Sequence, residues 1–359
     1  MLRHKTFQNK IAVSRFSLPV TATLIAMIWV AVGLVQGDIW TELAFALAST
    51  LLMVELNNRN ALMRTYSRMV SCSFLTLLSV TSLPEPSLHA NVVTLCFIAF
   101  TLLIWNGYQD RQSTGRTFYA FACLGIASME FVQILYYLPI LWAMMMFFTN
   151  SFSLRNFAAS ILGVIIPYWF AAGFFVYTNN IDYLIAHFTS FIDFHTLFDY
   201  SMITVHQLVN LSFITLLAVI GAVHFLRTSY ADKIRTRMIY ESFIMLDIVS
   251  FLFLVLQPQH EYELEGIMIV CTAPLFAHFI TFTKGKLCNI TFVTILVMAV
   301  LLLLYNLLFS PPSCCYDSLA YFVPGRMGLL GHARGSIPCR QLFPLQQRGG
   351  HGRTAGCRS

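Results

Sequence analysis

The sequence predicts an all-α protein, a polytopic bundle of transmembrane helices. Hydrophobic residues make up 57% of the 359 residues, charged residues only 11%, and the mean hydropathy is +0.70. Soluble domains carry about a quarter charged residues. The apolar residues fall in runs of roughly 16 to 25, long enough for a helix to cross a bilayer core of about 30 Å. This composition excludes a disordered chain, a coiled coil and a basic nucleic-acid-binding domain.

The first apolar run, 18–36, follows four basic residues and is too long for the apolar core of a signal peptide. We therefore expect an uncleaved first span. No link between the later runs is long enough for a soluble domain, so residues 1–309 are expected to form one integral membrane domain. The further runs are 39–56, 69–83, 90–105, 117–148, 157–177, 205–226, 238–257, 267–283 and 288–309.

Run 117–148 decides the number of spans, because its 32 residues have no strong break. Two helices of about 16 residues would each reach roughly 24 Å, slightly short of the bilayer core. Glu130 and Gln133 lie at the midpoint and Pro139 follows. We therefore predict a hairpin with a polar apex, which gives about eleven spans in total.

The distribution of Lys and Arg favours this hairpin. Short basic links stay in the cytoplasm. With eleven spans and a cytoplasmic N-terminus, every basic link is cytoplasmic, whereas a single pass through 117–148 would place the four basic residues of 227–237 outside. The basic links are 57–68, 106–116, 149–156, 227–237 and 284–286. The links 178–204 and 258–266 contain acidic residues but no Lys or Arg, as expected of external links.

The tail, 310–359, differs in composition from the membrane domain. It holds 8 of the 18 Gly, 5 of the 12 Pro, 6 Arg and no Lys, and it shows no periodicity. Two explanations are open, a disordered extension or an altered reading frame, and the exclusive use of Arg favours the second.

Ionisable residues at membrane depth are candidate functional residues, because an unpaired charge there is costly. Asp247 lies nine residues into its run, and His278 in the next run could hydrogen-bond to it. Glu241 and His224 lie near the same ends of adjacent runs and could pair likewise. Such groups serve either as a proton relay or as polar contacts that hold helices together.

Other candidates lie at the span ends. Arg59, in a polar stretch at 55–60, could bind a substrate phosphate, or it could simply lie among lipid headgroups. Glu130 at the hairpin apex and the external acids Asp38, Asp193 and Asp199 are candidate catalytic residues. The link 178–204 also repeats His187, Phe191, His195 and Asp199 every four residues, which indicates an amphipathic helix at the outer interface or a cation site.

Three segments, 54–60, 108–111 and 163–170, resemble a family of uncharacterised multi-pass inner-membrane proteins of Bacteroides-type bacteria. The likeness covers most of residues 1–309. It implies a bacterial inner (plasma) membrane as the location and no particular activity.

A looser resemblance is to the membrane glycosyltransferases that use polyprenyl-phosphate sugars. The shared features are a short helix pair with a Pro, an Arg-containing turn and a Gly…Pro helix, here 131–148, Arg155 and 163–167. This likeness implies a lipid-linked substrate. Those enzymes keep a catalytic acid in a long first external loop, whereas here that loop is reduced to Gly37 and Asp38.

Two functional hypotheses follow. One is a glycosyltransferase-like enzyme that acts on a lipid-linked substrate at the outer face through Glu130, Asp38 or the acids of 178–204. The other is a proton-coupled transporter or flippase that uses Asp247, Glu241, His224 and His278, with a non-catalytic assembly partner as a further alternative. The sequence indicates the lipid bilayer as its environment, no nucleic acid, and no particular cofactor, metal or oligomeric state.

Overall fold

The computed structural model describes residues 7–36, 40–83, 87–192, 198, 200, 203–283 and 286–309, and every regular element in these ranges is helical. The expectations for the tail, 310–359, lie outside the described residues. The elements are α1 Phe7–Val13, α2 Ser17–Gln36, α3 Trp40–Asn60, α4 Met69–Ser82, α5 Leu88–Trp105, α6 Thr114–Glu130, η1 Val132–Tyr137, α7 Leu138–Phe147, α8 Leu154–Tyr177, α9 Ile181–Ile192, α10 Val205–Thr228, η2 Ser229–Ala231, α11 Ile234–Leu256, η3 Pro258–His260, α12 Glu261–Phe282 and α13 Lys286–Phe309.

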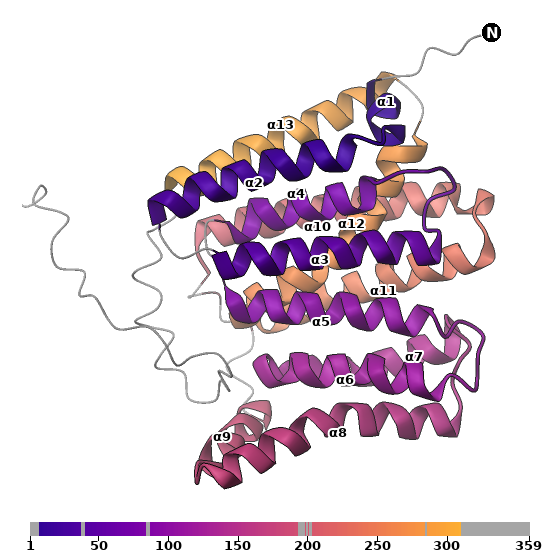
Figure 1. Ribbon diagram of the computed structural model, residues 1–359. Helices are drawn as coiled ribbons and strands as arrows, with labels where there is room; N and C mark the ends of the chain where they lie inside the picture. The colour runs from indigo at the N-terminus through magenta and orange to yellow at the C-terminus, as the bar shows by residue number, and fades with distance from the viewer. Residues whose placement is uncertain are drawn as a thin grey trace, which may run out of the picture.

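Seven of these helices are long and apolar enough to cross a membrane: α2, α5, α8, α10, α11, α12 and α13. The described chain is therefore all-helical, with several helices suited to a lipid bilayer. Three further helices run alongside them in the bundle (Figure 1). They are α3, which has three charged residues, α4 with 14 residues and α6 with 17.

The basic links 57–68, 106–116, 149–156 and 227–237 gather at one end of the bundle, which we call the basic end. Hydrogen bonds and an ion pair join these links across long stretches of sequence, as the charge alternation requires. The contacts are Gln8 Nε2 to Ile280 O at 2.7 Å, Arg64 Nε to Asp232 Oδ1 at 2.6 Å, Gln109 N to Thr149 O at 2.8 Å and Arg235 Nη2 to Trp105 O at 2.9 Å.

The chain reverses within 117–148. Helix α6 begins near the basic end and runs away from it, and its regular backbone stops at Phe131, whose φ and ψ are −136° and 89°. Helix α7 then leads back to Thr149, which accepts a hydrogen bond from Gln109. This reversal agrees with the predicted hairpin, and the turn falls next to Glu130.

Helix α12 is the centre of the bundle. All its residues except Tyr262 and Phe282 are buried, and it packs against α4, α5, α10 and α11. The helix pair α6–α8 lies at the edge of the bundle (Figure 1) and is packed very closely. A Cβ on Gly163 of α8 would lie 2.5 Å from the carbonyl oxygen of Phe118 in α6, so only glycine permits this approach.

Candidate functional site

Glu130 lies at the end of the bundle opposite the basic end, where it pairs with His89. The distance from His89 Nδ1 to Glu130 Oε2 is 2.5 Å, and the side chains are 34% and 8% exposed. Glu130 is the last residue of α6, and His89 lies in the first turn of α5, which Ser87 caps. A carboxylate only accepts hydrogen bonds, so Nδ1 of His89 is the donor, and in the neutral imidazole Nε2 is then the nitrogen with the lone pair.

Helix α9 lies against the same region. The ring of Phe191 stacks on Tyr136 of η1 with centroids 4.7 Å apart. His187, 1% exposed, lies 3.3 Å from the Tyr168 hydroxyl, which also donates to Ser128 near the end of α6. The opposite face of α9 exposes Ile181 and Ile185. A helix with one face on the protein and an exposed apolar face suits a membrane interface.

Three candidate acids, Asp38, Asp193 and Asp199, lie outside the described residues, as does His195. In the part of the chain that the structure describes, no group of three or more His, Cys, Asp or Glu side chains could hold a metal ion.

Asp247 is buried between α11 and α12, but its partner is Thr272 and not His278. The Thr272 hydroxyl lies 3.3 Å and 3.5 Å from the two carboxyl oxygens. Asp247 is 7% exposed. The contact to His278 that the sequence suggested is not formed.

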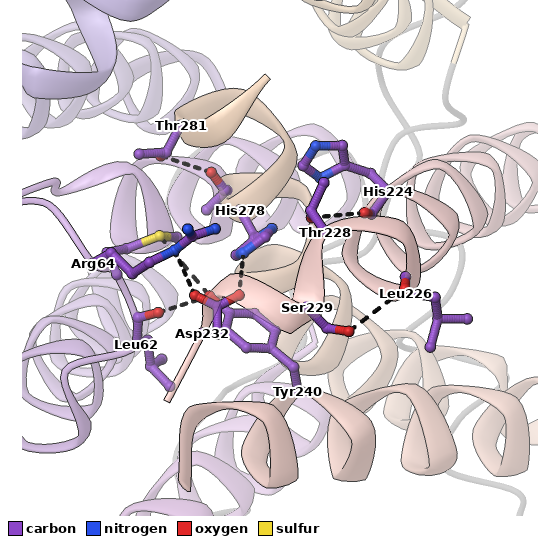
Figure 2. A network of polar contacts seen from close by, with 12 residues as sticks. Leu62, Arg64, His224, Leu226, Thr228, Ser229, Asp232, Tyr240, His278 and Thr281 are labelled. Carbon is purple, nitrogen blue, oxygen red and sulfur yellow. Dashed lines mark hydrogen bonds and ion pairs between the residues drawn. The ribbon is translucent and has the colours of Figure 1, made fainter. Parts of the chain in front are cut away.

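His278 instead joins a polar cluster at the basic end, made with Arg64 and Asp232 (Figure 2). Its Nε2 donates to Asp232 Oδ2 at 3.2 Å, and the Asp232 Oδ1 is 2.6 Å from Arg64 Nε. The side chains of Asp232 and His278 are fully buried, while Arg64 is 34% exposed and lies over the ring of Phe282. Burial raises the pKa of Asp232 above its ordinary 3.8, and the guanidinium of Arg64 opposes that rise.

The remaining candidates do not form the expected pairs. The ring of His224 lies 5.4 Å from that of His278, and its Nδ1 has no hydrogen-bond partner among the described residues. It therefore contacts this cluster and does not pair with Glu241. Arg59 pairs with Glu55 on the exposed surface of α3 at 2.5 Å. Surface pairs of this kind contribute little stability.

His89, Arg64 and Asp232 are missing from the candidates that the sequence suggested. Asp232 has one visible signal, since it is the only acid in a link with four basic residues. His89 and Arg64 have no such signal, because their importance depends on partners 41 and 168 residues away in the chain (89 to 130, 64 to 232).

Comparison of the chain with protein-family models, with curated proteins and with solved structures gives no match.

Proposed function

We propose that this chain is an eleven-span protein of a bacterial inner membrane that acts on a lipid-linked substrate, as polyprenyl-phosphate glycosyltransferases do. The basic end would be cytoplasmic, which places the His89–Glu130 pair at the outer face. That pair is the observation on which the proposal depends. A histidine oriented by a buried carboxylate is a common general base.

In this proposal His89 Nε2 removes the proton from an acceptor hydroxyl as that oxygen attacks the sugar. Glu130 holds the imidazole in the required tautomer and stabilises the imidazolium that forms. The polyprenyl phosphate leaves. Helix α9, whose exposed face carries Ile181 and Ile185, would hold the lipid end of the substrate beside the turn at Phe131.

The test is release of polyprenyl phosphate from a polyprenyl-phosphate sugar by the reconstituted protein in the presence of host membrane acceptors. Glu130→Gln and His89→Gln should each lower the rate by about 100-fold, the usual contribution of general base catalysis. Glu55→Gln, which changes an exposed glutamate at the basic end, is the matched control and should keep the rate. If the unaltered protein releases no polyprenyl phosphate, the transferase proposal is wrong.

Proton-coupled transport is the second candidate, and the buried helix α12 favours it. Ionisable or polar groups lie on or against this helix near both ends and at the middle: Glu265, Thr272 with Asp247, and His278 with Asp232. Glu265 also lines a small polar cavity of about 20 Å³ with Asn91 and Thr94, which is enough for one water molecule. Successive groups are six or seven residues apart, or about 10 Å along the axis.

Proton flux into proteoliposomes, followed with an enclosed pH-sensitive dye, separates the two candidates. A relay through Asp247 predicts that Asp247→Asn folds normally but abolishes the proton flux, because an amide cannot bind and release a proton as a carboxylate does. A purely structural Asp247 predicts unchanged flux, since the amide can still accept from Thr272.

A further inference from the structure

A groove runs between the N-terminal parts of α6 and α8. Its volume is about 480 Å³, and its lining residues are Thr114, Gly115, Phe118, Arg155, Ala158, Ala159 and Leu162. The groove lies at the basic end, on the helix pair at the edge of the bundle (Figure 1). No lining residue is acidic.

The exposed lining of the groove is apolar, and the residues with polar side chains, Arg155 and Thr114, lie at its mouth. Arg155 is the second residue of α8, and Thr114 and Gly115 open α6. Leu162, 56% exposed, lies seven residues beyond Arg155, or about 10 Å toward the membrane interior. A phospholipid has the same order, with a charged headgroup at the surface and an acyl chain below it.

The charge at the mouth is positive and available. Arg155 is exposed and forms no ion pair or hydrogen bond with the described residues, whereas Arg116 nearby donates to Asn106 O at 2.7 Å. The first turns of two helices add a partial positive charge, and the Ser113 side chain does not cap that of α6. Basic pockets between transmembrane helices on the cytoplasmic side bind anionic lipid headgroups.

We propose that this groove is a binding site for an anionic phospholipid, with the headgroup phosphate on Arg155 and one acyl chain along Phe118 and Leu162. The site is independent of the His89–Glu130 pair, which lies at the other end of the bundle. Gly115 offers a way to block the groove, because a Cβ built there meets no atom within 4 Å. A leucine at this position therefore has room for its Cβ, and we expect its side chain to enter the groove.

The experiment titrates phosphatidylglycerol into phosphatidylcholine nanodiscs that contain the full chain, with the melting temperature as readout. Anionic lipid that binds the folded state raises the melting temperature. We expect Arg155→Gln to need about five times more phosphatidylglycerol for the same rise, as loss of one headgroup contact predicts. Gly115→Leu should lose most of the rise while melting like the unaltered protein in phosphatidylcholine alone. Arg111→Gln, an exposed arginine at the same end, is the matched control and should keep the rise.

Three outcomes would overturn the proposal. The first is an undiminished rise in Arg155→Gln, whatever Gly115→Leu does. The second is an equal loss in Arg111→Gln, which would indicate diffuse attraction to the basic end. The third is the same rise with soluble glycerol phosphate in phosphatidylcholine nanodiscs, which would show that an acyl chain is not needed.

Discussion

At the scale of single residues, Asp232 joins two other segments of the chain through its side chain, although the sequence did not suggest it as a candidate. It lies between η2 and α11, binds Arg64 from the link after α3 and accepts from His278 of α12. A fully buried carboxylate is tolerated only with such partners, and loss of one partner from a buried pair usually costs about 3–5 kcal/mol. The cluster therefore fixes three segments to one another at the basic end.

Replacing Arg64 with Gln should destabilise the protein in a pH-dependent way. Burial raises the pKa of Asp232 and Arg64 opposes this, so the variant has a still higher pKa. Below the ordinary value of 3.8 both proteins carry a protonated Asp232 and differ little. As the pH rises to neutrality, only the unaltered protein ionises Asp232 beside a guanidinium. The deficit should then approach about 3 kcal/mol, the low end for a buried pair because Arg64 is partly exposed.

Thermal melting in detergent between pH 3.8 and neutrality measures this deficit. Arg59→Gln is the control, since Arg59 forms an exposed pair whose loss should cost little at any pH. A deficit for Arg64→Gln that is the same at every pH would show that the ion pair with Asp232 is not its cause.

At the scale of helices, close packing at glycine holds the edge of the bundle together. Gly125 and Gly163 let α6 and α8 approach until a Cβ on either residue would meet backbone atoms within 3.0 Å. Helices in lipid associate through such packing, because burial of apolar surface provides no driving force there. The groove proposed to bind lipid lies between the N-terminal parts of the same two helices, so their spacing also determines its width.

Gly163→Ala should lower the stability of this helix pair by about 1–3 kcal/mol, since overpacking a tight interface forces the backbones apart. Gly173→Ala is a control on the same helix, because a Cβ there meets nothing within 4 Å. The control should be neutral or slightly stabilising through its better helix propensity. Melting temperatures of the two variants in one detergent make the comparison, and equal effects would argue against the close contact.

At the scale of the whole molecule, the sequence predicted the helices well and their partners poorly. The apolar runs match the helices to within a few residues at most ends, even at the reversal near Glu130. This is possible because the hydropathy of a segment can be read from that segment alone. The runs also place Asp247 and His278 within their helices, α11 and α12. Which side chain faces them depends on how each helix is rotated in the bundle, and so Thr272 and Asp232 were not foreseen.

The positions of residues at the two ends of the helix bundle allow the orientation of the protein in the membrane to be tested. Position 155, in the first turn of α8, and position 230, in η2, lie at the basic end, as the contacts of Ser153 with Arg111 and of Asp232 with Arg64 indicate. Thr189 is exposed on α9 near the other end. If the basic end is cytoplasmic, a membrane-impermeant thiol reagent applied to intact cells should label a cysteine at 189 and leave cysteines at 155 and 230 unlabelled.

Each single cysteine would be introduced after replacement of the nine native ones, and permeabilised cells provide the control that all three positions can react. Labelling of 155 and 230 but not of 189 in intact cells would show that the protein has the opposite orientation in the membrane, with the His89–Glu130 pair on the cytoplasmic side. Labelling of 230 alone would place 155 and 230 on different sides, which would contradict their common end in the bundle. The first result would remove the outer-face proposal and leave the fold unchanged, whereas the second would overturn the helix arrangement itself.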